Sequence, residues 1–326
     1  MNRQKDIYCE LGFWRSLSSR FSNIKMSTNL DELKQNENLM DWYGLLCRSH
    51  ILFDCTVDEF ETAAKEDLYL KEIWKKSTDG RCLLDFSPGA VKKMCTGPSQ
   101  METAMYNSIF LTNTNHPAEA CNVGVFNISS DRIFDYSKIF NDSGPSIKKD
   151  SKCNWLEILK NANAQQNCSS IVIADNYIFK DVNSNLYKIL DALLPQKLDT
   201  QFYLTIFSLN ESVESESEKK KQSLNKKIQE IRPKLSVKLE VFNSSKDDFH
   251  DRGIITNYLW IEIGAGFNII RVNGLAGKTT NLHVSYPMII PEDRMKCSKD
   301  GYWNIIEDAK KYLKISSNIS NNRLLR

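Results

Sequence analysis

Histidine is scarce in this sequence, and closely spaced cysteines are absent. The chain has four histidines, and its nine cysteines are scattered without a CxxC pair. Zinc sites built on paired cysteines are therefore not expected. An odd, scattered set of cysteines is typical of reduced thiols, so we expect a cytoplasmic protein.

Long apolar runs and a strong net charge are also missing. No run approaches the roughly eighteen residues that a transmembrane helix needs, and the N-terminus lacks the charged-then-apolar pattern of a secretion signal. We therefore expect no transmembrane segment. The formal net charge is only +2, so any surface that binds nucleic acid must be local.

The length and composition predict two α/β domains. A chain of 326 residues with 41% hydrophobic and 26% charged residues is large enough for two cores. Residues 1–38 are polar with isolated aromatics, which predicts a flexible N-terminal arm. Residues 39–150 are expected to form a smaller α/β domain of unassigned role. Turn formers and charges at 142–152 mark the boundary with a second domain over 151–326.

Short apolar runs separated by helical or loop segments characterise the smaller domain. One of these runs, Ile51 to Phe53, ends at Asp54. A carboxylate in this position is a candidate metal ligand of a nuclease-like fold. Aspartates after strands more often cap a helix or form a turn, so a structural role for Asp54 is the main alternative.

Helical and strand patterns alternate in the second half of the chain. Helices are predicted from near Asn154, over 186–194 and around Leu224, and strands over 171–174, 202–207 and 235–241. This alternation predicts a mixed, mainly parallel sheet flanked by helices. Ligand sites in such sheets lie beyond the carboxyl ends of the strands, and Asp175 and His250 both follow predicted strands.

Chemically useful side chains gather between residues 250 and 268. This segment contains His250, Arg252, Asn257, Glu262 and a glycine-rich turn. In an extended strand His250 and Arg252 point to the same side. Asn257 would join them only through a bulge or turn near Gly253. We expect any chemical site to lie here.

At these residues the sequence resembles the phospholipase D superfamily of phosphodiesterases, whose signature is HxKxxxxD followed by a Gly-Ser-x-Asn turn. His250, Arg252 and Asn257 stand at the signature spacings, and Glu262 sits where nuclease-like members often carry a glutamate. Gly264 to Asn268 resembles the turn, with one residue inserted and Ala265 in place of serine.

The variant with arginine and asparagine looks most like one branch of this superfamily, the phospholipase D-like domain at the C-terminus of MIT-domain (microtubule-interacting and trafficking) proteins. The run Asp175-Asn176-Tyr177 also looks like this branch. The resemblance thus covers about 151–326 and implies a phospholipase D-like domain there. That branch is associated with lipid binding more than with hydrolysis.

The resemblance implies chemistry that needs no metal or other cofactor. A histidine attacks phosphorus, a cation holds the non-bridging oxygens, and a second histidine protonates the leaving group. It implies the catalytic residues His250, Arg252, Asn257 and Glu262, and the substrate-binding residues Asp175, Tyr177, Gly264, Gly266 and Asn268. Asn257 lacks the charge of the family aspartate, which Asn257→Asp would restore; a gain in activity would mean that the site has drifted from a catalytic ancestor.

Three classes of function follow. The first is a metal-independent phosphodiesterase, more specifically a nuclease acting on DNA or RNA. The second is a module that binds nucleic acid or phospholipid headgroups without cleavage, and the third is a scaffold. Lys219 to Leu239 contains eight Lys or Arg residues and one acid, which indicates either a solvated helix face or a surface that follows phosphates.

The need for a second histidine predicts a homodimer. The chain contains one HxR motif, and family members with a single motif pair two chains about a two-fold axis. Trp260 and Phe267 are candidate interface anchors because aromatic residues are enriched at interface cores. Burial inside the monomer is the alternative for both.

Overall fold

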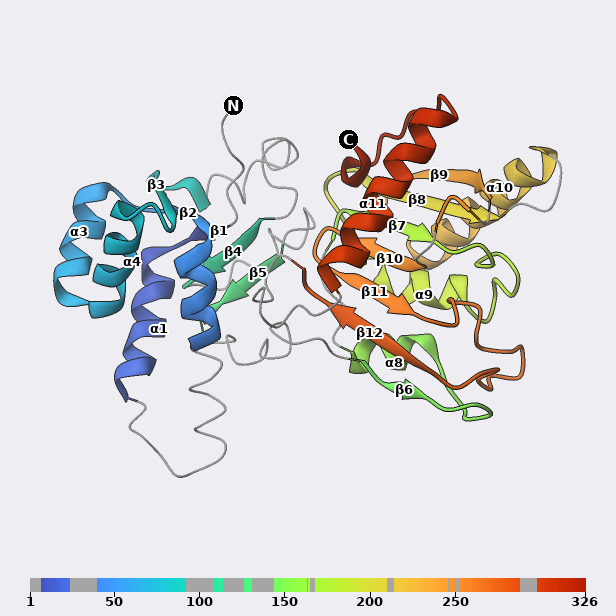
Figure 1. Ribbon diagram of the computed structural model, residues 1–326, viewed down its shortest axis with the longest axis horizontal. Helices are drawn as coiled ribbons and strands as arrows, with labels where there is room; N and C mark the ends of the chain where they lie inside the picture. Colours follow the sequence, from blue (N-terminus) through green and yellow to red (C-terminus); the bar gives the residue numbers. More distant parts are fainter. Residues whose placement is uncertain are drawn as a thin grey trace. The chain divides into compact units, whose positions relative to one another are not determined.

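The protein consists of two compact units, Met1–Phe140 and Asn141–Arg326 (Figure 1). Each unit contains its own sheet and its own helices, so both are α/β units. The computed structural model describes residues 7–23, 40–91, 108–113, 126–130, 144–162, 164, 168–209, 214–245, 247–249, 252–287 and 298–326.

The first unit is built on a parallel five-stranded sheet with the order β3-β2-β1-β4-β5. Its strands are β1 (Ile7–Cys9), β2 (His50–Phe53), β3 (Leu83–Phe86), β4 (Ile109–Thr112) and β5 (Phe126–Ser129). Parallel neighbours require crossover connections, which are commonly helical. The helices described in this unit are α1 (Leu11–Asn23), residues 40–48, α3 (Val57–Glu66) and α4 (Leu68–Thr78).

Residues 7–23 differ from the flexible arm that the sequence predicted. β1 is the central strand of the sheet and pairs with both β2 and β4. In α1, which follows directly, Phe13 and Trp14 are fully buried. A three-residue strand buried on both faces produces no polar and apolar alternation, so periodicity could not reveal it. Residues 1–6 and 24–38 of the expected arm lie outside the described residues.

Asp54 has the structural role of a backbone cap. Its two carboxylate oxygens accept hydrogen bonds from the N–H groups of Ala90 (3.1 Å) and Val91 (3.2 Å). Neighbouring helices begin in a similar way. Thr56 and Glu59 form a capping box at α3, and Asp67 accepts the N–H groups of Tyr69 and Leu70 at α4. The observed contacts of Asp54 therefore match the common alternative for a strand-end aspartate.

The second unit is built on a mixed seven-stranded sheet with the order β6-β12-β11-β10-β7-β8-β9. Three neighbouring strands are parallel: β7 (Ser170–Ala174), β8 (Phe202–Leu209) and β9 (Val237–Ser244). The other four pair in antiparallel fashion: β10 (Gly253–Thr256), β11 (Trp260–Ile263), β12 (Thr280–Ser285) and β6 (Ser146–Ile147). The predicted mixed sheet is confirmed, but it is not mainly parallel.

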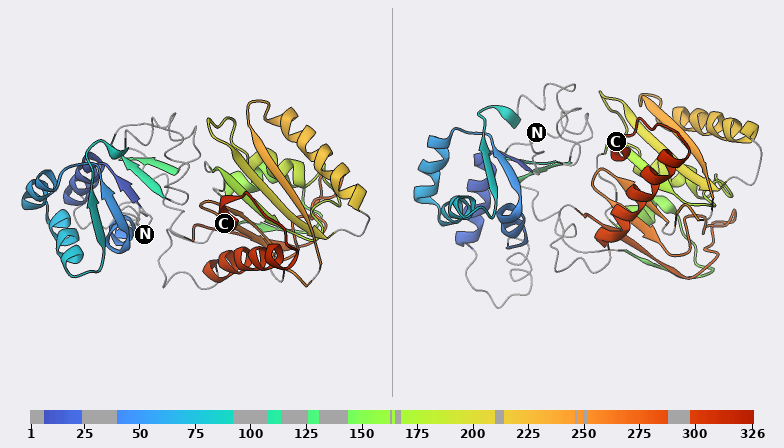
Figure 2. Two further views of the ribbon diagram at one scale, coloured as in Figure 1. Left: turned by 90° about the horizontal axis from the view of Figure 1, so that it is seen from above. Right: turned by 45° about the horizontal axis from the view of Figure 1, so that its top comes forward.

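Helices cover both faces of this sheet. Figure 2 shows α11 (Ser298–Ile315) on one face and α10 (Glu214–Ile231) on the other. The helix α8 (Trp155–Asn161) packs against α9 (Leu186–Leu193), which contacts α10, and a short 3-10 helix, η2 (Arg323–Leu325), packs on β7 and α11. The helices and strands predicted between residues 154 and 241 are confirmed. No helix in the described part of the chain is long and apolar enough to cross a membrane.

The second unit begins before the predicted boundary. β6 lies in the segment 142–152 that the sequence marked as a boundary, and it pairs with β12 in the register Thr280 to Ile147. Asp150 also bonds through its N–H to the carbonyl of Ala276. The polar segment is thus an edge of the second sheet. Its two-residue strand is too short to produce a pattern.

Candidate functional site

Three chain segments meet at one end of the strands of the second sheet, where β7 ends, β10 begins and β11 ends. We refer to this row of strand ends as this edge of the sheet. Asp175 follows the last residue of β7, and Gly253 at the start of β10 pairs with Ala174 at the end of β7. Arg252 precedes Gly253, so Arg252 and Asp175 lie at the same edge. β11 runs antiparallel to β10 and returns the chain to this edge at Ile263. The glycine-rich turn begins with the next residue.

Asp175 is buried at this edge, with 2% of its surface exposed. One carboxylate oxygen accepts the N–H of Tyr177 (2.8 Å), and the other accepts the N–H of Phe267 (2.6 Å). Burial raises the pKa of this carboxyl above its ordinary value, while the two backbone hydrogen bonds and the nearby charge of Arg252 oppose the rise. Asp175 therefore joins the glycine-rich turn to the end of β7.

Arg252 lies between Asp175 and an aromatic ring. Its guanidinium carbon is 5.5 Å from the centroid of the Tyr177 ring, which is a cation–π distance. The residue as a whole is half-buried. A planar guanidinium held in this way suits the binding of a phosphate or another oxyanion.

Gly266 allows the turn to approach these two side chains. Its N–H donates to the carbonyl of Ile263 (2.8 Å), and its φ is 76°, in the left-handed region. A Cβ atom here would lie 3.0 Å from Oδ2 of Asp175 and 3.1 Å from Nη1 of Arg252. At Gly264, by contrast, an added Cβ would meet open space. We refer to Asp175, Tyr177, Arg252 and Gly266 as the Arg252 cluster.

Asn268 belongs to an amide network behind the turn. Its Oδ1 accepts a hydrogen bond from Nδ2 of Asn185 (2.8 Å). The fully buried Asn185 also accepts from the indole N–H of Trp155 (2.9 Å) and from the N–H of Ile270 (3.0 Å). The sequence analysis did not identify Asn185, because an asparagine before a helix usually caps that helix. Asn268 thus positions the loop, and its side chain is directed to Asn185.

The structure does not bring Asn257 into the Arg252 cluster. Asn257 lies in the turn between β10 and β11, at the opposite end of the hairpin. Its Oδ1 accepts the N–H groups of Ser169 and Ser170 (2.9 Å each), and its Nδ2 donates to Oγ of Ser169 (3.2 Å). β10 continues from Gly253 as a regular strand, so the bulge that would redirect Asn257 does not form. Asn257 secures the start of β7.

Glu262 lies on a different face from the one expected. It pairs with Gly253, and residues directly opposite in an antiparallel pair share a face of the sheet. An added Cβ at Gly253 would lie 2.5 Å from Cδ1 of Ile305 in α11, so this face is the one that α11 covers. Successive side chains of an extended chain alternate between the two faces of a sheet, so Arg252, which precedes Gly253, points to the opposite face.

The expected nucleophile and the two expected interface anchors complete the set of predicted residues. His250 lies outside the described residues, two positions before Arg252 in the sequence. Trp260 (3% exposed) and Phe267 (0%) are core residues of the unit and do not provide exposed interface anchors. Trp260 packs so tightly against α11 that Gly301 has no room for a side chain, and the Phe267 ring lies 5.9 Å from the Trp155 ring.

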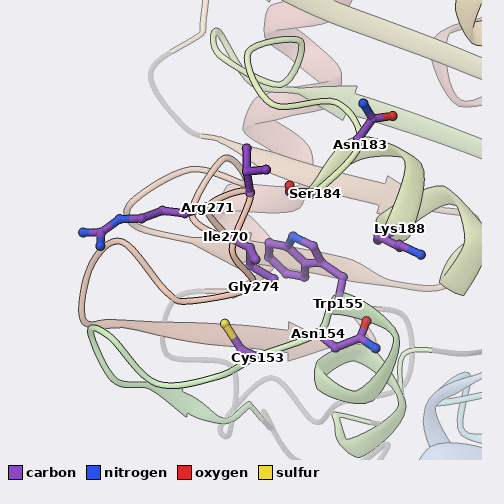
Figure 3. Close-up of a pocket in the computed structure, with 10 residues that line it drawn as sticks. Cys153, Asn154, Trp155, Asn183, Ser184, Lys188, Ile270, Arg271 and Gly274 are labelled. Carbon is purple, nitrogen blue, oxygen red and sulfur yellow. The ribbon is translucent and has the colours of Figure 1, made fainter.

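A pocket of about 430 Å³ lies on the α8 and α9 side of the loop 270–274 (Figure 3). None of the predicted site residues lines it. In Figure 3 the Arg271 side chain extends away from Trp155 and Ile270, and its guanidinium pairs with Asp150 at 3.1 Å. The pocket lining is Cys153, Asn154, Trp155, Asn183, Ser184, Lys188, Ile270, Arg271, Val272 and Gly274.

The Arg252 cluster offers one cation, one buried carboxylate and a close glycine turn. Within the described ranges, no group of three or more His, Cys, Asp or Glu side chains could hold a metal ion. The cluster can bind an oxyanion through Arg252, with Asp175 holding the turn. No protein-family model matches the chain, and the search of curated proteins found no match either.

Proposed function

We propose that the second unit is a phospholipase D-like phosphodiesterase that acts without a metal ion, and more specifically a nuclease. The observation that carries this proposal is the position of Arg252. Its guanidinium lies at the carboxyl end of β7, over the Tyr177 ring and next to a turn where a Cβ added at Gly266 would lie 3.1 Å from Nη1 of Arg252. Ligand sites of α/β sheets lie at such an edge.

The position of Asn257 also supports the proposal. An asparagine in place of the family aspartate would weaken catalysis if its charge were needed beside the phosphate. Asn257 is beyond the far end of the four-residue strand β10, roughly 17 Å of extended chain from Arg252, where its amide bonds to the start of β7. The substitution therefore removes no charge from the Arg252 cluster.

The proposed reaction assigns the nucleophile to His250 on its sequence position. A nitrogen of His250 attacks phosphorus, the P–N bond forms, and the bond from phosphorus to the leaving oxygen breaks. A second histidine gives its proton to that oxygen, and water then cleaves the P–N bond to release the phosphate product. Arg252 stabilises the charge on the non-bridging oxygens in both steps.

The second histidine would come from another copy of the chain. A two-fold homodimer would bring the His250 residues of two protomers to one phosphate. Because Trp260 and Phe267 are buried in the monomer, the proposed dimer must use other residues at this edge. Sedimentation at micromolar concentration tests the dimer, and a monomer that still cleaves substrate would contradict it.

The direct test is hydrolysis of DNA, RNA and phospholipid panels in the presence of a chelator. We expect His250→Ala to abolish nuclease turnover and Arg252→Gln to lower it by about 10²- to 10³-fold, as loss of an anion-stabilising donor does. His283→Ala is the matched control, because His283 is an exposed histidine of the same unit. Turnover that disappears with the chelator would contradict the metal-free mechanism.

A binding module is the second candidate. The observation that favours it is that the Arg252 cluster presents a cation for phosphate, while its one carboxylate, Asp175, is engaged by the N–H groups of Tyr177 and Phe267. This candidate predicts binding of nucleic acid or phospholipid headgroups that depends on Arg252 and persists in His250→Ala, without turnover in the wild type.

The cysteines fit a cytoplasmic location for both candidate functions. Six free cysteines are described: Cys9, Cys47, Cys55, Cys82, Cys153 and Cys168.

A further inference from the structure

Cations lie over aromatic rings along one segment that leads away from the Arg252 cluster. Arg252 and Lys180 lie over the Tyr177 ring, at 5.5 and 5.9 Å from its centroid. Farther along the chain, Lys220 lies 5.7 Å from the Phe179 ring, and Lys227 lies 5.9 Å from the Tyr187 ring. We refer to Arg252, Lys180, Lys220 and Lys227 as the cation strip.

The fold explains why these groups form a continuous strip. The three rings belong to residues 177–187, which connect the end of β7 to α9. Lys220 and Lys227 are two helical turns apart on α10, which lies beside α9 (Figure 1). The hydroxyl groups of Tyr187 and Ser223 are 3.4 Å apart and tie the two helices together. The strip therefore starts at the Arg252 cluster and continues along α10.

Lysines dominate the middle of α10. Residues 219–229 contain five lysines and no acid, whereas Glu214, Glu216 and Glu218 precede this stretch and Glu230 follows it. Arg232 is buried and bonds to Asp191, so it serves the core, and Lys227 pairs with Glu230 at 3.0 Å. Lys219 and Lys226 are exposed and add further positive charge to the same helix. A polyanion is the partner that such a surface attracts.

The rings give the cations a defined geometry. A free lysine side chain loses conformational entropy when it is fixed on a ligand, and a side chain already held against a ring loses less. Tyr177, Phe179 and Tyr187 are half-buried, so each ring is anchored in the fold while its cation stays near the surface. The rings thus preorganise a row of positive groups that matches a chain of phosphates better than a single anion.

We propose that the cation strip binds the phosphodiester backbone of a nucleic acid and leads it to the Arg252 cluster. This inference rests on the proposed function and names its substrate class. Membrane surfaces are the competing partner, but they require apolar side chains for insertion. The described exposed large hydrophobic residues all lie outside residues 177–187 and α10; they are Met40, Val57, Leu83, Leu156, Val272, Trp303, Ile315 and Ile319.

The test uses the full-length protein and a fluorescent single-stranded DNA oligonucleotide. The variant Lys220→Gln/Lys227→Gln removes two phosphate contacts, so we expect about tenfold weaker binding near physiological salt. The slope of log K against log salt should fall by about 1.4, because each contact contributes about 0.7 on single strands. Lys220→Arg/Lys227→Arg should retain binding, and circular dichroism checks that each variant is folded.

The matched control is Lys311→Gln/Lys314→Gln. It removes the same charge from exposed positions of α11, on the other face of the sheet, and should leave DNA binding unchanged. Equal losses in the two variants would overturn the strip as a defined site. Loss of binding to phosphatidylserine vesicles with unchanged DNA binding would overturn nucleic acid as the partner.

A small phosphodiester separates this inference from the proposed function. Bis(p-nitrophenyl) phosphate is too short to reach α10, so its hydrolysis should be unchanged in Lys220→Gln/Lys227→Gln. If the variant hydrolyses this substrate and binds DNA as tightly as the wild type, the cation strip is refuted as the DNA-binding surface, and the proposed phosphodiesterase activity is supported. If the wild type hydrolyses nothing but its DNA binding depends on the strip, the enzyme is refuted and the strip stands.

Discussion

At the scale of single residues, the Arg252 cluster depends on one buried charge. Asp175 accepts backbone N–H groups from two segments that are far apart in the sequence. Burial makes its ionised form costly, and the two hydrogen bonds and Arg252 reduce that cost. The charges of Asp175 and Arg252 are therefore coupled, and removing the charge of Arg252 changes the pKa of Asp175.

The coupling predicts a pKa change. Arg252→Gln removes a positive charge that lowers the pKa of Asp175, so we expect this pKa to rise further above its ordinary value. Because the folded state then holds the proton more tightly than the unfolded state, stability should fall as the pH rises through a window that extends to higher pH in the variant. Carboxyl carbon NMR titration measures the pKa directly.

The control for this titration is Arg271→Gln. Arg271 pairs with the exposed Asp150 at 3.1 Å in the same unit, so its loss should leave the pKa of Asp175 unchanged. An unchanged Asp175 pKa in Arg252→Gln would contradict the proposed coupling.

Substitution by alanine should lower the free energy of unfolding at Gly266 but not at Gly264, although both glycines belong to one turn. Gly266→Ala places a side chain at φ 76° and against Asp175 and Arg252, so we expect a loss of at least about 1 kcal/mol in the free energy of unfolding. Gly264→Ala adds a methyl group to open space and should stay within about 0.5 kcal/mol of the wild type. Urea denaturation compares the two, and similar losses would refute the described turn.

At the scale of elements, the hairpin of β10 and β11 separates two roles. One end brings Arg252 and the glycine-rich turn to the edge where Asp175 lies. The other end contains Thr256, whose hydroxyl accepts the N–H groups of Tyr258 and Leu259, and Asn257, which bonds to Ser169 and Ser170. The first half of the motif thus holds the proposed chemical groups, and the second half aligns the strands.

This separation changes the expected result of Asn257→Asp. A carboxylate can still accept the N–H groups of Ser169 and Ser170, and the residue lies far from the Arg252 cluster. We therefore expect the activity of Asn257→Asp to equal that of the wild type. Asn257→Leu leaves both N–H groups without their partner and should cost at least about 2 kcal/mol of stability. Activity assays and thermal melts check both variants. A large gain in the activity of Asn257→Asp would mean that residue 257 does act in catalysis, as the family aspartate does.

The sequence predicted part of this arrangement because strand order along the chain limits where strand ends lie. Asp175 and Arg252 each adjoin a strand of the second sheet, and their shared edge follows from the antiparallel pairing of β7 and β10. The place of Asn257 was not predictable in the same way, since it depends on whether the strand bulges. The roles of Lys220 and Lys227 depend on packing between α9 and α10, which residue spacing does not encode.

At the scale of the whole molecule, the chain contains two units with separate cores. The first core holds clustered aromatic rings such as Phe53, Phe60 and Trp74, while the second is centred on the fully buried β7. Because β1 has only three residues and all are buried, the sequence pattern did not reveal that the first unit begins with this strand. The Arg252 cluster belongs entirely to the second unit.

Residues 141–326 should therefore fold without the first unit. The fragment contains all seven strands of its sheet, including β6, which a fragment starting at residue 151 would lack. We expect a cooperative urea transition for 141–326 and a less stable fragment for 151–326, because the latter exposes the edge of β12. A non-cooperative transition for 141–326 would mean that the first unit is needed for folding.

We propose that this unit cleaves phosphodiesters through a histidine nucleophile, and trapping the covalent intermediate is the decisive experiment. Wild-type protein is incubated with a nucleic-acid substrate and a chelator, quenched during turnover and digested for mass spectrometry. We predict an acid-labile adduct on the peptide that contains His250, in which phosphorus is bonded to the histidine and keeps its remaining nucleoside ester. The adduct and turnover should both be absent in His250→Ala. Undiminished turnover in His250→Ala, or turnover without the adduct, would contradict this mechanism.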